Sequence, residues 1–357
     1  HLELNMELSG SLWHGHEMIF GYGGAVLAGF LLTVTVNWTG LKTVGGLGVG
    51  VLLFLWLAAR VTSSTGLWFP GAAFLEFAFF TATAVAIARP ILLARKWRNL
   101  AFPIVLLTLA AADLVIHLAA LGQIEQAWIP VSLWVATDAI ALTLLIFAGR
   151  IIPLFTAKAL SLSPPRAKGI LDYLGIGSVA LLAAAHALQL TGRSEALLWI
   201  LAGALNLTRL YGWGGSKTLK TPLLWVLHLG WLFMCLGMLL TGYALHSPGR
   251  LSYASALHLL LVGGFGTLTL GMMARVSLGH TGRKLVAGRL SAAAFVLIAL
   301  ATLLRVSVGL WAPEALGTET HMNLLWAAAL LWSLSFLLFL LANTAYLLSP
   351  RPDGKPG

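Results

Sequence analysis

Long apolar runs, separated by short polar or charged breaks, dominate this sequence and restrict what it can fold into. A helix needs roughly 20 apolar residues to cross the hydrocarbon core of a bilayer, and eleven runs approach or exceed that length. They cover residues 16–36, 44–59, 67–88, 100–121, 128–149, 170–190, 195–214, 222–245, 251–274, 290–311 and 321–347. Because 59% of the residues are hydrophobic and only 10% are charged, the chain lies outside the composition range of water-soluble domains.

The runs also lack the alternation of apolar and polar residues that marks outer-membrane strands. Since backbone groups in lipid must be satisfied internally, helices remain as the spanning elements. The sequence therefore predicts an all-α, polytopic transmembrane bundle with about 11 spans. We expect a single integral membrane domain over residues 1–357, because no polar break is long enough to hold a second, soluble domain.

The lysines and arginines between the runs are distributed unequally over the two sides of the predicted bundle. Seventeen fall on one side, and only Arg60, Arg193 and Arg250 fall on the other. Cytoplasmic loops carry the excess of positive charge. We therefore expect residues 1–15 to be periplasmic and residues 348–357 to form a cytoplasmic tail. Residues 1–15 resemble no signal peptide, and we expect the natural N-terminus to precede them.

Charge and cysteine content exclude several classes of function. The formal net charge of +10 is explained by the basic loops, and no separate basic patch with interleaved aromatic residues indicates nucleic-acid binding. Cys235 is the only cysteine, which excludes an internal disulfide, a haem c attachment motif and a cysteine-ligated iron–sulfur cluster. Histidine and carboxylate chemistry remains.

Two histidines and a glutamate stand where the first apolar run begins. His14, His16 and Glu17 occur within four residues, directly after Trp13. Imidazole is a good ligand for zinc, copper and iron. Two imidazoles separated by one residue can converge on one ion or serve two adjacent ions. The pattern predicts a metal centre near the outer surface, with copper, zinc and haem almost equally open, and a redox centre is the first hypothesis.

Ionisable residues inside a span are costly and often functional. Asp113 lies four residues before His117, so both occupy one helix face. The carboxylate could orient that imidazole or pass it a proton, as partners of metal-bound histidines do, or it could form a helix-packing hydrogen bond. Arg209 could bind a propionate or phosphate, or extend towards the lipid headgroups.

The remaining histidines divide by predicted depth. His258 lies in the outer half, and the glycines that follow His16 and His258 would admit either a flat macrocycle or a neighbouring helix. His228 and His280 lie towards the cytoplasm, where they could form a second haem site or contact a quinone, although surface solvation is the simpler interpretation of His280. We expect the other internal histidines, His186, His246 and His321, to be structural or at the surface.

Five segments together resemble the NnrS family. They are WHGHEMIFGYGGAVLAGFLLTVTVNWTG (13–40), GRIIPLFT (149–156), RLYGW (209–213), LHLGW (227–231) and ALHLLLVGGFGTLTLGMMARVSLGHTGR (256–283). The resemblance implies a haem- and copper-containing protein of the bacterial inner membrane that acts in nitric oxide metabolism and protects against nitrosative stress. It also implies about twelve spans, of which the first is absent here. The sequence departs from the family pattern at Thr35-Val36-Asn37, where the family typically has a proline.

On this resemblance we expect reduction of NO to N₂O at a haem iron with a second metal nearby. Haem b, in one or two copies, and copper would be the cofactors. The expected metal ligands are His14, His16, His117, His228 and His258. We expect Glu17 and Asp113 to deliver protons, and Trp13, Arg209 and His280 to contact a cofactor.

Electrons would come from membrane quinol or a periplasmic donor, because the chain carries no nicotinamide fingerprint. Two other functions remain open. One is a haem or copper protein that binds or senses NO without catalysis, which would need no proton donor. The other is a transporter whose polar pathway contains Glu76, Asp138 and Arg209.

Overall fold

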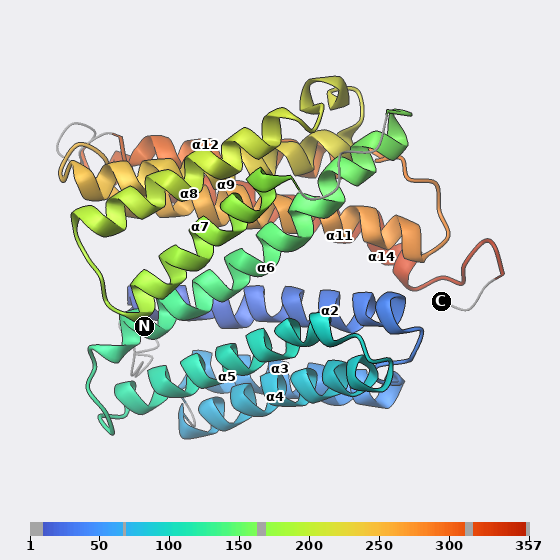
Figure 1. Cartoon of the computed structure of the whole chain (residues 1–357), viewed down its shortest axis with the longest axis horizontal. Helices are drawn as coiled ribbons and strands as arrows, with labels where there is room; N and C mark the ends of the chain where they lie inside the picture. Colours follow the sequence, from blue (N-terminus) through green and yellow to red (C-terminus); the bar gives the residue numbers. More distant parts are fainter. Residues whose placement is uncertain (1–9, 67–68, 163–168, 311–316, 355–357) are drawn as a thin grey trace. The chain divides into compact units, whose positions relative to one another are not determined.

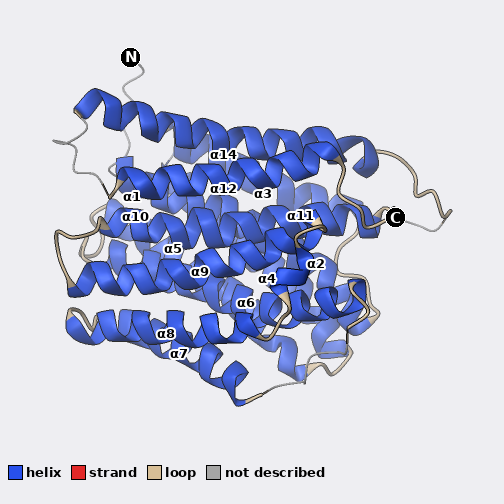
Figure 2. Ribbon diagram, turned by 90° about the horizontal axis from the view of Figure 1, so that it is seen from above, coloured by secondary structure: helices blue, strands red, loops and turns tan. Residues whose placement is uncertain are grey.

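The computed structural model describes residues 10–66, 69–162, 169–310 and 317–354, and these are mostly helical, with no strand among them (Figures 1 and 2). The prediction of an all-α chain is confirmed. The predicted outer segment 1–15 is described only from residue 10, and the predicted tail 348–357 only to residue 354.

The contacts of the chain divide it into two compact units. Unit 1 comprises His1–Thr143 and His186–Gln189, and unit 2 comprises Leu144–Ala185 and Leu190–Gly357. Two helices contribute residues to both units, namely α6 (Trp128–Ala159) and α7 (Ile170–Ala187).

The described part of unit 1 begins with one continuous helix over Gly10–Thr39. This helix consists of α1 (Gly10–His16), the π-helical segment η1 (Glu17–Gly23) and α2 (Gly24–Thr39). It ends at Gly40, whose φ of 70° suits a glycine after a helix and whose N–H donates to Val36 O. The other elements are α3 (Gly46–Thr65), α4 (Phe69–Leu93), the short η2 (Trp97–Leu100) and α5 (Ala101–Ala120). Helix α4 contacts α2, α3 and α5 and is central to this unit.

Unit 2 is organised around α9. Its elements are α8 (Arg193–Tyr211), η3 (Gly215–Thr218), α9 (Pro222–His246), α10 (Tyr253–His258), the π-helical segment η4 (Leu259–Gly266), α11 (Thr267–His280), α12 (Arg289–Val308) and α14 (Thr318–Leu347). Helix α9 contacts α8, α10, η4, α11 and α12, while α14 packs mainly against α12.

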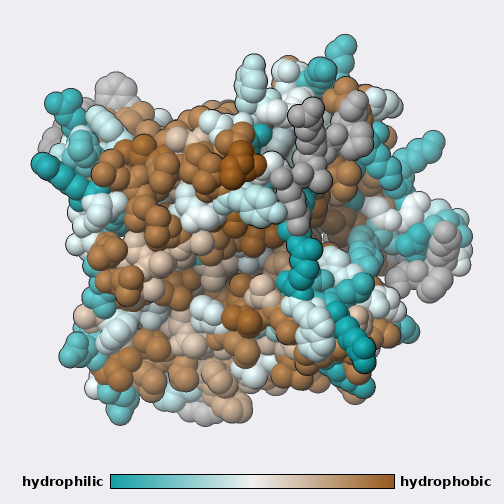
Figure 3. All heavy atoms as spheres, in the orientation of Figure 1, coloured by the Kyte–Doolittle hydropathy of each residue, from teal (hydrophilic) through white to brown (hydrophobic). Residues whose placement is uncertain are grey.

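Ten of the described helical segments are long and apolar enough to cross a membrane, so the chain is a multi-pass membrane protein. The predicted run at 195–214 is also helical, as α8, but it is not among the ten because polar side chains interrupt it. Figure 3 shows hydrophobic side chains over the helices, with many hydrophilic ones near helix ends. Apolar side chains such as Phe54 and Phe74 are exposed, as is expected of helices that contact lipid.

The two π-helical segments share one sequence register. Each follows a histidine, His16 or His258, and each of these histidines is followed by glycines five, eight and thirteen residues later. π-Helical turns are rare and frequently occur at functional sites. One helix in each unit therefore has the same local construction directly after a histidine.

Helix packing accounts for the glycines that follow these histidines. A Cβ atom on Gly24 would lie 2.6 Å from Cζ of Phe80 on α4, and one on Gly263 would lie 2.7 Å from Cγ2 of Thr302 on α12. The missing side chains let neighbouring helices approach closely. Of the two sequence interpretations, a neighbouring helix occupies this space.

Candidate metal centre

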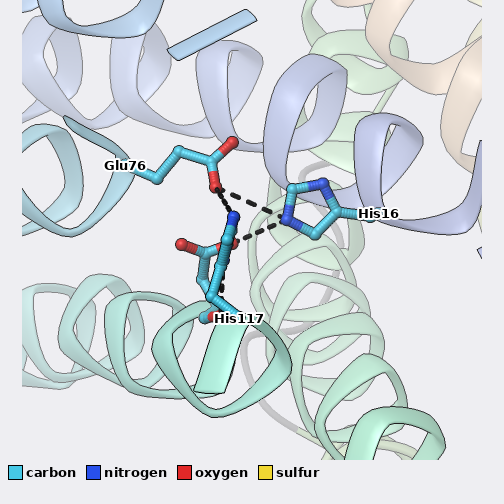
Figure 4. Close-up of side chains that lie close together, drawn as sticks. His16, Glu76 and His117 are labelled. Atoms are coloured by element: carbon cyan, nitrogen blue, oxygen red, sulfur yellow. Dashed lines mark hydrogen bonds and ion pairs between the residues drawn. The ribbon is translucent and has the colours of Figure 1, made fainter. Parts of the chain in front are cut away.

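Four side chains from three helices of unit 1 converge on one point. His16 ends α1, Glu76 lies on α4, and Asp113 and His117 lie on α5. Each offers one ligand atom, and these four atoms all lie within 4.8 Å of one another. Figure 4 shows Glu76 pointing towards both imidazole rings. All four side chains are buried, with exposed fractions of 2% or less.

Two of the three short distances among these atoms are close to those between ligands around one small ion. Glu76 Oε2 lies 3.5 Å from His16 Nε2 and 3.5 Å from His117 Nε2, while Asp113 Oδ1 lies 2.8 Å from His16 Nε2. With metal–ligand bonds of about 2.1 Å, a tetrahedral site separates its ligand atoms by about 3.4 Å. The cluster therefore needs little rearrangement to coordinate an ion.

The local helix geometry explains how His117 is presented. Its Nδ1–H donates to the backbone oxygen of Asp113, 3.0 Å away and four residues earlier. That bond fixes the tautomer and leaves Nε2 as the nitrogen that faces Glu76. The Asp113 carboxylate is 3.6 Å from His117 Nδ1 but only 2.8 Å from His16 Nε2. Asp113 and His117 share a face as expected, but the backbone of Asp113 rather than its carboxylate orients His117.

His16 has a carboxylate at each of its ring nitrogens. Nδ1 is 3.2 Å from Glu17 Oε1, and Nε2 is 2.8 Å from Asp113 Oδ1. A neutral imidazole has one N–H and satisfies only one of these acceptors, whereas an imidazolium, with two N–H groups, satisfies both. A metal ion on Nε2 would take the place of the second proton and leave Nδ1–H for Glu17, which is the arrangement common around metal-bound histidines. The buried Asp113 Oδ2 also lacks a hydrogen-bond partner among the described residues.

A second group of side chains surrounds the cluster on its more exposed side. Arg60 Nη1 donates to Glu17 Oε2 at 2.5 Å, and Ser63 Oγ donates to Glu17 Oε1 at 2.9 Å. Arg60 Nη2 also forms an ion pair with Glu76 Oε1. The sequence placed Arg60 in an outer loop, but it lies within α3. Its long side chain reaches the two carboxylates on neighbouring helices, which stabilises a charge near the end of this span.

The cluster suits a compact ion and does not suit a porphyrin. The ring centroids of His16 and His117 are only 5.3 Å apart, and the carboxylates of Glu76 and Asp113 stand beside the ring nitrogens, where a macrocycle would have to pass. Two imidazoles and two carboxylates are ligands for divalent zinc, copper, iron or manganese. The donor set contains no thiolate or thioether, the ligands that select Cu⁺.

Two of the other predicted residues lie beside the cluster in sequence without joining it. His14 is exposed on α1, and Trp13 is half-buried there. One helical turn cannot direct both His14 and His16 at the same point, because residues two apart face different directions. Only the second histidine of the motif therefore contributes a donor atom to the cluster.

The predicted residues of unit 2 have separate surroundings. His258 ends α10, half-buried, and its Nδ1–H donates to Ala254 O at 2.6 Å. His228 Nε2 is 2.9 Å from Thr156 Oγ1, and a Cβ on Gly215 would lie 2.9 Å from His228 Nδ1, so both ring nitrogens are closely surrounded. His280 is exposed at the end of α11.

Arg209 belongs to a buried polar and aromatic group. It donates to Asp172 Oδ1 at 2.9 Å and to Asn206 Oδ1 at 2.7 Å. Its guanidinium also lies over the rings of Trp213 and Trp231. These contacts satisfy the charge within unit 2, so its immediate partners are protein groups.

The sequence alone indicates other roles for two residues at the centre. It is compatible with Glu76 as part of a transport pathway and with Arg60 as a loop charge. The available signal was that both are charged and fall in or next to apolar runs, where an opposite partner is needed. Which helices become neighbours cannot be read from one sequence, so their partners stayed unknown.

The comparisons with known proteins point to one family. Residues 1–351 match the family described as NnrS protein. No curated protein and no solved structure matches the chain.

Proposed function

The chain belongs to the NnrS family, and from this we propose that the His16, Glu76, Asp113 and His117 cluster is a metal centre at which nitric oxide is metabolised. The observation that carries the proposal is the convergence of four buried donor atoms within 4.8 Å of one another. Burying two carboxylates beside two imidazoles is unfavourable unless a cation compensates them. Family membership supports nitric oxide as the molecule on which the centre would act.

We propose reduction as the reaction: 2 NO + 2 e⁻ + 2 H⁺ give N₂O + H₂O. A bound metal would supply a site that holds NO and stabilises developing charge. His16 and His117 would hold the metal through Nε2, with Glu76 and Asp113 as oxygen donors. The electrons would come from membrane quinol or a periplasmic donor.

Glu17 is the proposed proton donor of the centre. Its side chain is 13% exposed, whereas those of Glu76 and Asp113 are almost fully buried. It also contacts His16, so it lies between the surface and the donor atoms. Asp113, the other carboxylate expected in this role, stands among the ligand atoms, where it would bind the cation.

Copper and haem b would occupy different places. The donor set fits copper, particularly as Cu²⁺, and excludes a porphyrin for the steric reason given above. Haem b would bind away from this cluster. His258, whose Nδ1–H donates to Ala254 O, would ligate it through Nε2 only from a face other than the one where Gly263 meets Thr302. We propose the bacterial inner membrane as the location, with the His16 end of α1 facing the periplasm.

Metal analysis and an NO assay on the purified protein test this function. The detergent-solubilised protein is analysed for metal and haem, and its reduced-minus-oxidised spectrum is recorded before and after NO. NO consumption and N₂O formation are then measured with a competent reductant. We expect the protein to consume NO and form N₂O, and we expect the His16→Ala/His117→Ala double variant to lose both activities. Full metal and haem content without NO consumption would contradict the proposal.

The Glu17→Gln variant separates catalysis from NO binding alone. If the protein reduces NO, this variant should bind metal and NO but turn over more slowly, because an amide cannot donate the proton. If the protein only binds or senses NO, the variant should be unchanged in every assay. The exposed His246, changed to Gln, is the matched control for both experiments.

A further inference from the structure

Arg60 joins two carboxylates of the proposed centre through one guanidinium group. Nη1 donates to Glu17 Oε2, and Nη2 pairs with Glu76 Oε1. The other oxygen of each carboxylate faces a histidine: Glu17 Oε1 is 3.2 Å from His16 Nδ1, and Glu76 Oε2 is 3.5 Å from His16 Nε2. Arg60 therefore contacts both a carboxylate that would bind the metal and the carboxylate that orients a ligand histidine. Arg60 itself supplies no atom that would bind the metal.

The backbone of η1 makes room for this guanidinium. A Cβ on Gly21 would lie 2.9 Å from Arg60 Nη1 and 3.2 Å from Glu17 Oε2. The carbonyl oxygen of Gly21 accepts a hydrogen bond of 2.9 Å from Trp56 Nε1. Trp56 lies one helical turn before Arg60 on α3, so this bond holds α3 against η1 where the guanidinium enters. Only 14% of the Arg60 side chain is exposed.

The charges of this group explain why a fixed cation would be useful. Glu17, Glu76 and Asp113 contribute three negative charges, and Arg60 contributes one positive charge, so the group carries a net charge of minus two with neutral imidazoles. One divalent ion would make it neutral, whereas a monovalent ion would leave an excess charge in a low-dielectric region. Without Arg60 the same donors would carry minus three.

We propose that Arg60 is a positioning residue that acts as the fixed counter-charge of the metal centre. It changes the net charge of the group from minus three to minus two, which one divalent ion neutralises, and it thereby limits how strongly the centre favours a divalent over a monovalent ion. This inference rests on the proposed metal centre. It goes beyond that proposal by stating what sets the charge of the ion that is bound.

Copper is the probe that tests the inference, because it binds as both Cu²⁺ and Cu⁺. Metal-depleted full-length protein in detergent is titrated with Cu²⁺ and, under reducing conditions, with Cu⁺, each against a competing chelator. The ratio of the two affinities is the readout. Arg60→Gln should raise the ratio of Cu²⁺ to Cu⁺ affinity by about tenfold or more, which corresponds to a fall of about 59 mV in a one-electron potential.

Three further variants separate charge from other effects. Arg60→Lys keeps the charge and should stay within about threefold of the wild-type ratio, because the Coulomb interaction depends on charge and distance. Arg89→Gln removes an exposed charge from the same helix as Glu76 and should change nothing. The double variant Arg60→Gln/Glu17→Gln restores the net charge of minus two and should return the ratio towards the wild-type value. The new amide oxygen can still accept from His16 Nδ1.

The outcomes that would overturn the inference are specific. One is an Arg60→Gln variant that binds copper fully with the wild-type ratio. Another is an Arg60→Lys variant that shifts as far as Arg60→Gln, which would assign the effect to geometry. Should Arg60→Gln fail to fold, the lysine and double variants carry the test.

The copper readout also keeps this inference distinct from the proposed function. A protein with the expected pattern of ratios but no NO consumption would contradict the proposed function alone. A protein that consumes NO with a ratio independent of Arg60 would contradict the counter-charge alone. A wild-type protein without copper at the cluster would contradict both.

Discussion

His16 lies within 3.5 Å of three carboxylates that come from three different helical segments: Glu17 in η1, Glu76 on α4 and Asp113 on α5. Its position at the junction of α1 and η1 makes this possible, because the wider π-helical turn changes the direction of the residues that follow. His14, two residues earlier, is exposed. The two histidines of one short motif therefore have different environments.

This difference predicts different results for two alanine substitutions. His16→Ala should lower metal affinity by more than about 100-fold, a larger loss than removal of a partner outside the ligand shell causes. His14→Ala should keep the wild-type affinity, because its side chain contributes no atom to the cluster. Competition titration with Zn²⁺ measures both. Equal losses in the two variants would show that the metal binds elsewhere.

Arg209 is expected to stabilise unit 2. Arg209→Met removes the partner of Asp172 and Asn206 and the cation that stacks on two tryptophans. We expect a loss of about 2 kcal/mol in the free energy of unfolding, because buried polar groups lose their partners. Thermal unfolding in detergent should show a lower Tm.

Arg193→Met is the matched control for Arg209→Met, since Arg193 is exposed on the same helix. Its Tm should stay at the wild-type value, and metal content should be unchanged in both variants. A loss of metal without a change in Tm for Arg209→Met would favour a cofactor-binding role instead.

At the scale of elements, the sequence predicted the helices well and their partners poorly. Apolar runs predict spans because hydrophobic length is a local property, and the pair Asp113 and His117 could be placed on one face from spacing alone. The pairing of Arg60 with Glu17 and Glu76 depends on which helices become neighbours and at which rotation. A single sequence does not state which helices become neighbours or how they are rotated.

The same limit explains the π-helical segments. Gly23 and Gly24 indicate a close approach, and the choice between a macrocycle and a helix requires the position of Phe80. The wider turn itself gives no local sequence signal beyond the glycines. Trp56, whose Nε1 donates to the carbonyl oxygen of Gly21 in this turn, lies in the next helix.

Gly24→Ala tests how η1 and α2 support the centre. The new methyl group would lie 2.6 Å from Phe80 Cζ, so the Phe80 ring or the helices α2 and α4 must shift. Phe80 is one turn from Glu76 on α4, and we therefore expect weaker metal binding together with a loss of about 1–3 kcal/mol in stability. Zn²⁺ titration and thermal unfolding measure these effects.

A second substitution should rescue that variant. Phe80→Leu shortens the side chain that Gly24→Ala would contact, so the double variant should regain most of the lost metal affinity. Gly29→Ala is the control, because a Cβ there meets nothing within 4 Å. An unaffected Gly24→Ala variant would mean that the helices tolerate the separation.

For the whole molecule, the distribution of basic residues predicts the orientation in the membrane. Alkaline phosphatase, which requires an oxidising compartment for its disulfides, should be active when fused after Ser247, between α9 and α10. It should be inactive when fused after Asp353. A fusion after Lys96 serves as a second cytoplasmic control and should also be inactive. The reverse pattern would place the His16 end of α1 in the cytoplasm and contradict the periplasmic site.

The order of charges along the chain has a consequence for membrane insertion. Glu17, Arg60 and Glu76 come from three successive helical spans, and their signs alternate. A lone charge within a span raises the cost of insertion, by up to roughly 2.5–3.5 kcal/mol at the centre. As each new span leaves the ribosome, it brings a side chain of opposite charge that can pair with the charged residue of the span before it. The ion-pair network can therefore be assembled stepwise during biogenesis, with few unpaired charges exposed to lipid at each step.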